Sequence, residues 1–383
     1  MNRRLRGCAA CLLVIGMWGA AAQAQPAAGG GLAPMALALI QNPNQGEIDA
    51  WVKAATTDLL NEKNPAGQAK ARELMVNACW EKLNVAPAGA GFLAAYSTSI
   101  NNEFEPRLPP KGKATPRQRL NMAIVAAKVA GVAQQSPLAP TIQLLINDPL
   151  EPVVLWGLKG AQPIAPAVVK LVIGKDPLHP MLKGIPKAVR EHPSGPIFEE
   201  GYAALGAATT VDPGANPALD KAVKAATAEL IGLWENRLQQ YRSAIPQDPI
   251  ADAKPVFYLT TRDAWNTVVK DQATRTQVMQ MIADQLSLAA QHADASKDKD
   301  PEKRQQLVRL SQLCVGACSV VGTHQSNDPL RRTAEGAMRD IDMVKQNLGK
   351  IRGSADAVGD EVRRAYPGVK PSPLLSEPGV ARP

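Results

Sequence analysis

Apolar residues recur at helical spacing along the C-terminal half of the chain, and this pattern limits the architecture more than any other feature. Between 217 and 245, successive apolar residues stand three or four positions apart, which brings their side chains onto one face of an α-helix. A helix with such a stripe is stable when another element covers it. The stripe consists of Leu219, Val223, Ala226, Leu230, Trp234, Leu238, Tyr241 and Ile245.

Two more stripes follow toward the C-terminus. After Asp300–Pro301 the apolar positions again keep helical spacing, and after Asp328–Pro329 they alternate between four and three residues, as in a heptad seam. Together the stripes predict long antiparallel helices across 211–366. The second stripe comprises Leu307, Leu310, Cys314, Ala317 or Cys318, and Val321, and the third comprises Leu330, Ala334, Ala337, Ile341, Val344, Leu348 and Ile351.

The composition favours helices packed on helices over a β-sandwich. Hydrophobic residues make up 45% of the chain but aromatic residues only 4%, so Ala, Leu and Val must fill the core. Only the short segment PVFYLTT, at 255–261, has the composition of a strand. The predicted fold class is therefore all-α, built from antiparallel helical hairpins.

The dipeptide Asp-Pro occurs six times and predicts helix starts. An aspartate side chain can accept hydrogen bonds from the unpaired N–H groups of a first helical turn, and proline is favoured at the first helical position. We therefore expect helices after several of these dipeptides, which begin at Asp148, Asp176, Asp212, Asp248, Asp300 and Asp328.

Two neighbouring segments in the middle of the chain are similar to each other. Residues 138–161 and 164–189 each contain an apolar helix, an Asp-Pro break and a second helix, and we assign 136–210 to such hairpins. This pattern resembles the HEAT-repeat family of α-solenoids, which implies stacked hairpins whose surface binds partners. A non-repetitive helical domain is the alternative. The matching residues are Pro140, Leu144, Leu145, Asp148, Val153, Val154 and Ala161, then Pro166, Val169, Leu171 and Asp176.

The N-terminus predicts export. Three arginines precede an apolar run that ends in a small-x-small cleavage site at 22–24, so residues 1–24 are typical of a secretory signal peptide. A leader (25–48) and a helical region (49–135) with helices near 66–84, 91–104 and 117–134 would follow. The proline-rich segment 367–383 predicts a disordered tail. We expect a periplasmic or extracellular protein with no further transmembrane span.

The sequence carries no specific pattern typical of a catalytic, cofactor or metal site. The sequence has no G-x-S-x-G, no phosphate-binding loop and no HExxH, and we predict neither a catalytic residue nor a cofactor. Cys79, Cys314 and Cys318 remain after signal cleavage. They are interpreted as buried core thiols, with a disulfide from Cys79 to one of the others, or a metal site with His324, as alternatives.

Interaction with another macromolecule is the remaining class of function. The chain carries a net charge of only +8, three units of it in the signal peptide, so nucleic-acid binding is not expected. We expect an exported, non-enzymatic scaffold that binds a protein partner, with Trp156 and His179 as contact residues. The alternative is an enzyme or binding protein that acts on envelope glycans. An acid-free basic loop could contact an anionic envelope polymer through Arg107, Lys111, Lys113, Arg117 and Arg119.

Overall fold

The computed structural model describes residues 43–81, 86–171, 176–296, 300–344 and 351–372, and these residues confirm an all-α fold. The strands are two residues long: β1 (Trp80–Glu81) pairs antiparallel with β2 (Ala86–Pro87). The predicted signal peptide, 1–24, lies outside the described residues, as does 25–42 of the predicted leader. Helix α2 already begins at Gln45, within the segment assigned to the leader.

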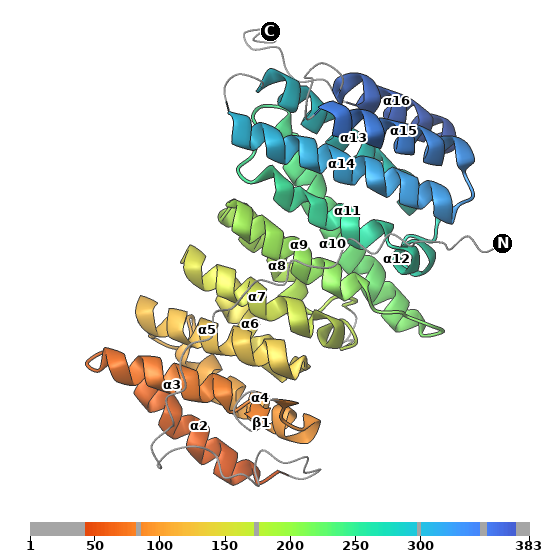
Figure 1. Ribbon diagram of the computed structural model, residues 1–383. Coiled ribbons are helices and arrows are strands. Elements are labelled where there is room, and N and C mark those ends of the chain that lie inside the picture. Colours follow the sequence, from red (N-terminus) through yellow and green to blue (C-terminus); the bar gives the residue numbers. More distant parts are fainter. Residues whose placement is uncertain (1–42, 82–85, 172–175, 297–299, 345–350, 373–383) are drawn as a thin grey trace, which may run out of the picture. The chain divides into compact units, whose positions relative to one another are not determined.

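The helices follow one another with short connections (Figure 1). Three short 3-10 helices, η1 (Glu105–Arg107), η2 (Ser136–Leu138) and η3 (Pro249–Asp252), lie between them. The α-helices are α2 (Gln45–Leu59), α3 (Pro65–Asn77), α4 (Ala90–Phe104), α5 (Pro116–Ala133), α6 (Ala139–Ile146), α7 (Glu151–Val168), α8 (Pro180–Glu191), α9 (Gly195–Thr209), α10 (Pro217–Tyr241), α11 (Ala253–Thr260), α12 (Arg262–Thr267), α13 (Gln272–Ala295), α14 (Pro301–His324), α15 (Asp328–Val344) and α16 (Ile351–Ala365).

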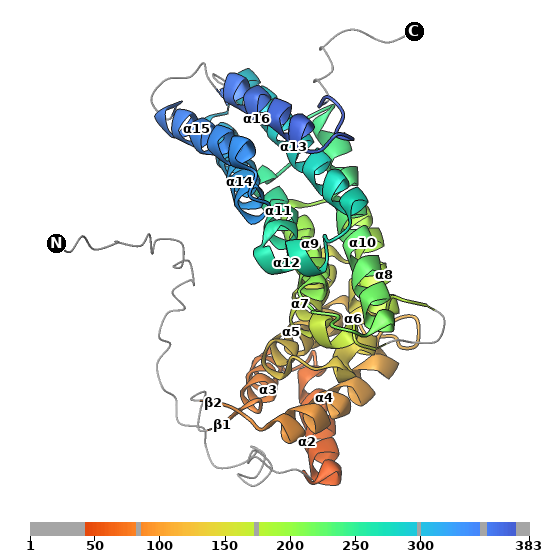
Figure 2. The same ribbon diagram turned by 90° about the vertical axis from the view of Figure 1, so that its right-hand side faces the viewer.

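Within this part of the chain the helices pack in two layers (Figure 2). Helices α3, α5, α7, α9, α11 and α14 contact one another in that order. Helices α2, α4, α6, α8, α10 and α13 do the same in the second layer. Because each helix packs mainly on neighbours close in sequence, the arrangement is solenoid-like, as expected for stacked hairpins.

Helix α7 changes the predicted repeat. It runs without interruption through Pro163 and Pro166, so the second helix of segment 138–161 and the first helix of segment 164–189 are one helix. The two similar segments therefore do not correspond to two separate hairpins, and the predicted boundary between them is wrong. The physical reason is packing, because the apolar face of α7 stays buried between α5 and α9 along its whole length.

The prediction that the aspartate of Asp-Pro caps a helix is confirmed for one α-helix, and the other five aspartates do not cap an α-helix in this way. Asp300 caps α14, where its side chain accepts a hydrogen bond from the N–H of Lys303 at 3.0 Å. Three other aspartates accept instead from the N–H two residues later, which is an Asx turn that precedes the helix. These are Asp148, Asp176 and Asp212; Asp328 is itself the first residue of α15, and Asp248 precedes only η3.

The segment predicted as a possible strand, 255–261, is largely helical. Its first six residues belong to α11, where Val256, Leu259 and Thr260 are buried at helical spacing between α9 and α14. The strand-forming composition does not produce a strand here, because tertiary packing decides the conformation of such a short segment. Phe257, on the neighbouring face of α11, is exposed.

The C-terminal stripes are confirmed where the structure describes them. The residues of the 307–321 stripe are buried on α14, and in the third stripe Leu330, Ala334, Ala337 and Ile341 are buried on α15. That stripe does not form one long helix, because α15 ends at Val344 and Ile351 begins α16. None of the described helices is long and apolar enough to cross a membrane.

Candidate functional site: two grooves between neighbouring helices

The three cysteines interpreted as core thiols lie at two places in the fold, Cys79 after α3 and the other two on α14. Cys79, Cys314 and Cys318 are free and buried, and burial raises the pKa of the Cys79 and Cys318 thiols to about 12. Cys314 and Cys318 lie on the buried stripe of α14, where they pack as small core residues. Across the described residues, no group of three or more His, Cys, Asp or Glu side chains could hold a metal ion.

The two predicted contact residues lie in different environments. Trp156 is half-buried against the core, and the Lys159 ammonium lies 5.1 Å from the centre of its ring. His179 is buried, and its Nδ1 accepts a hydrogen bond from the N–H of Met181 at 3.1 Å, which caps helix α8. The His179 ring therefore has a structural role, and burial lowers its pKa.

The five basic residues predicted to contact an anionic polymer do not form one free cationic patch. Arg107 pairs with Glu103, Lys111 with Glu105, and Arg119 with the buried Asp148 at 3.3 Å. Two residues, Lys113 and Arg117, are exposed and make no ion pair with the described residues.

A first groove is apolar and lies where α11, α14 and α15 meet. Four large hydrophobic side chains are exposed in the described structure, and three of them line this groove: Phe257 (64% exposed), Leu313 (43%) and Val320 (42%). Its volume is about 460 Å³. A contiguous patch of exposed large hydrophobic side chains is typical of an interaction surface, whereas single exposed hydrophobic residues are common on any soluble protein.

Helix α14 carries a second apolar stripe, and this stripe forms the groove wall. Leu313, Gly316, Ala317 and Val320 recur at spacings of three, one and three residues, so they share one face of the helix. The buried stripe with Cys314 and Cys318 lies on an adjacent face. A continuation of the groove toward α15 includes Gly316, Met338 and Arg339.

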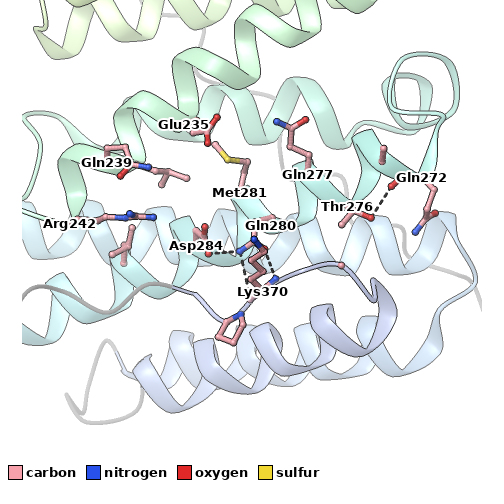
Figure 3. Close-up of a pocket in the computed structure, with 15 residues that line it drawn as sticks. Glu235, Gln239, Arg242, Gln272, Thr276, Gln277, Gln280, Met281, Asp284 and Lys370 are labelled. Carbon is pink, nitrogen blue, oxygen red and sulfur yellow. Dashed lines mark hydrogen bonds between the residues drawn. The ribbon is translucent and has the colours of Figure 1, made fainter.

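A second groove is polar and lies between α10, α13 and the segment that follows α16 (Figure 3). Its volume is about 870 Å³. Buried Leu238, Met281 and Leu288 supply its apolar lining. Its polar lining comes from Glu235 and Gln239 on α10, from Arg242 directly after α10, from Gln272, Thr276, Gln277, Gln280 and Asp284 on α13, and from Lys370.

The end of this groove holds a segment of the chain itself. Gln280 Oε1 accepts a hydrogen bond from the N–H of Lys370 at 2.6 Å, and Gln280 Nε2 donates to the carbonyl oxygen of Lys370 at 3.3 Å. The first residues of the predicted disordered tail, 367–372, are thus placed against α13, and Val369 is buried. Residues 373–383 lie outside the described part of the chain.

A buried ion pair connects the helices around both grooves. Arg237 of α10 and Asp252 of η3 are 1% and 0% exposed, and Arg237 Nε lies 3.2 Å from each carboxylate oxygen. Tyr241 donates to the same carboxylate at 2.6 Å and Tyr202 of α9 at 3.2 Å. Burial raises the pKa of Asp252, and Arg237 opposes that effect. The network fixes η3, and so the start of α11, against α9 and α10.

Sequence reasoning missed both grooves because their residues come from different helices. The helical spacing of Leu313, Gly316, Ala317 and Val320 is a sequence signal for the apolar groove, whereas the strand-like composition of 255–261 gives no sign that Phe257 lies beside it. No protein family model matches the chain, and no curated protein sequence is similar to it at a significant level.

Proposed function

We propose that this protein is an exported, non-enzymatic helical scaffold of the cell envelope that binds a protein partner through the apolar groove of α11, α14 and α15. The observation that carries the proposal is the convergence of Phe257, Leu313 and Val320 on one groove. The solenoid-like packing supports it, because stacked hairpins expose long surfaces to partners.

The groove fits an amphipathic helix of the partner. Leu313 and Val320 stand seven residues apart on α14, so they repeat along the direction in which a second helix would lie. Arg309 and Arg339 border the groove and its continuation, are exposed, and make no ion pair with the described residues. A helix with acidic residues beside its apolar anchors would complement both.

A photo-reactive amino acid placed at Phe257 or Val320 in the producing cells tests the location. We expect a defined adduct at both positions and none at the exposed Asn102 of α4. Mass spectrometry should locate the adduct in an amphipathic segment of the partner that contains Asp or Glu. An adduct to a second copy of the chain, or equal labelling at Asn102, would contradict the proposal.

A matched pair of substitutions tests the energetics with the partner so identified. Leu313 and Leu171 are 43% and 40% exposed, but only Leu313 lines the groove. Leu313→Asp should weaken binding by about tenfold or more, because burial of a leucine contributes about 1.5–3 kcal/mol. Leu171→Asp should leave affinity unchanged, and Arg309→Glu should weaken it. Equal effects of the two leucine substitutions would refute the docking site.

A further inference from the structure

The polar groove between α10 and α13 has a binding mode that the chain itself displays. The Gln280 carboxamide donates a hydrogen bond to the carbonyl oxygen of Lys370 and accepts one from its N–H, so one side chain pairs with both main-chain polar groups of that residue. Lys370 precedes Pro371, and a residue before proline favours an extended backbone. The held segment is therefore the kind of ligand that this end of the groove accepts.

Asp284 holds the clamping side chain in place. Its Oδ1 accepts from Gln280 Nε2 at 2.8 Å, and this contact orients the carboxamide with its oxygen toward the Lys370 N–H. The Gln280 carboxamide is therefore held in the orientation in which it pairs with a main-chain N–H and carbonyl.

The rest of the groove repeats the same chemistry without a partner. Gln239 of α10 and Gln277 of α13 are exposed lining residues, and neither carboxamide makes a hydrogen bond with a described residue (Figure 3). The lining charges have both signs, with Glu235 and Asp284 against Arg242 and Lys370, so the groove does not select a strongly charged ligand. Its volume of about 870 Å³ lies within the range of ligand sites.

We infer that this groove is a second binding site, which takes an extended peptide segment of another protein. The Gln239 and Gln277 carboxamides recognise the main chain of that peptide, which lies beside the segment held by Gln280. The site is separate from the apolar groove, so the inference is independent of the proposed function. Each carboxamide can pair with one N–H and one carbonyl of the ligand.

Selection from a displayed library of random linear peptides on the full chain tests the inference. Selected peptides should bind the Gln239→Ala/Gln277→Ala variant about fivefold or more weakly, since one hydrogen bond is worth about 1 kcal/mol. Gln305→Ala, on the exposed side of α14, is the matched control and should bind as the unchanged chain does.

Two readouts separate main-chain recognition from ordinary surface stickiness. Replacement of a ligand N–H by N-methyl should weaken binding about fivefold at clamped positions, whereas alanine substitution of the same ligand residues should not. In the protein, Gln280→Ala should speed hydrogen exchange at the Lys370 amide. Failure to select any peptide, equal binding to the double variant, or insensitivity to N-methylation would overturn the inference.

Discussion

Replacement of Asp252 by asparagine is the sharpest test of what holds the helices around the grooves together. The change keeps the side-chain volume but removes the negative charge from a site that is 0% exposed. Arg237 would remain buried, with Gln240 Oε1 at 3.1 Å and the carbonyl oxygen of Gln247 at 2.6 Å as its other partners. Loss of one member of a buried ion pair costs about 3–5 kcal/mol, and the retained contacts place the expected loss near 3 kcal/mol.

Urea unfolding at neutral pH, followed by far-ultraviolet circular dichroism, measures this loss. Arg237→Met alone should cost a similar amount, because Asp252 then stays buried without its cation. The double variant should cost about 2 kcal/mol less than the sum of the single changes, since the two residues are coupled. Glu191→Gln, in a pair with Lys187 that is more than half exposed, should cost less than about 1 kcal/mol. Equal losses for Asp252→Asn and Glu191→Gln would refute the reasoning.

Three further changes have defined outcomes. Gly157→Ala would place a methyl carbon 2.9 Å from the backbone nitrogen of Ile146, so melting and urea curves should show that the free energy of unfolding falls by about 1–3 kcal/mol. In the matched change Gly232→Ala, the new methyl group meets open space within α10, so the free energy of unfolding should rise by about 0.5–1 kcal/mol. Because burial lowers the pKa of His179, its contribution to stability is complete above about pH 6.5 and is lost as the pH falls through the lower folded-state pKa. Asparagine can cap the helix in place of His179 but does not titrate. His179→Asn should therefore reduce the fall in unfolding free energy that acidification causes. The Cys79 thiol should resist a thiol reagent at neutral pH until urea unfolds the chain, because it is buried with a pKa of about 12; rapid labelling of the folded protein would contradict its placement.

The local pattern of the sequence was sufficient for the fold class and for most long helices. A stripe such as Leu219–Tyr241 follows from the period of the α-helix alone, and any neighbouring element can bury it, so it is visible in the sequence without knowledge of that neighbour. Helices 91–104 and 117–134 were placed to within a residue or so for the same reason. The capping role of Asp300 could likewise be predicted, because it involves only the N–H of Lys303, three residues away.

Only the tertiary structure decided the features that could carry function. The burial of Val256 and Leu259 between α9 and α14 made 255–260 a helix and exposed Phe257, and packing on both sides kept α7 continuous across Pro163. The clamp on Lys370 joins residues 90 positions apart, and the Arg237–Asp252 pair closes the turn between α10 and α11. A sequence specifies spacing along one helix directly, whereas a groove depends on which faces remain uncovered after every helix has packed.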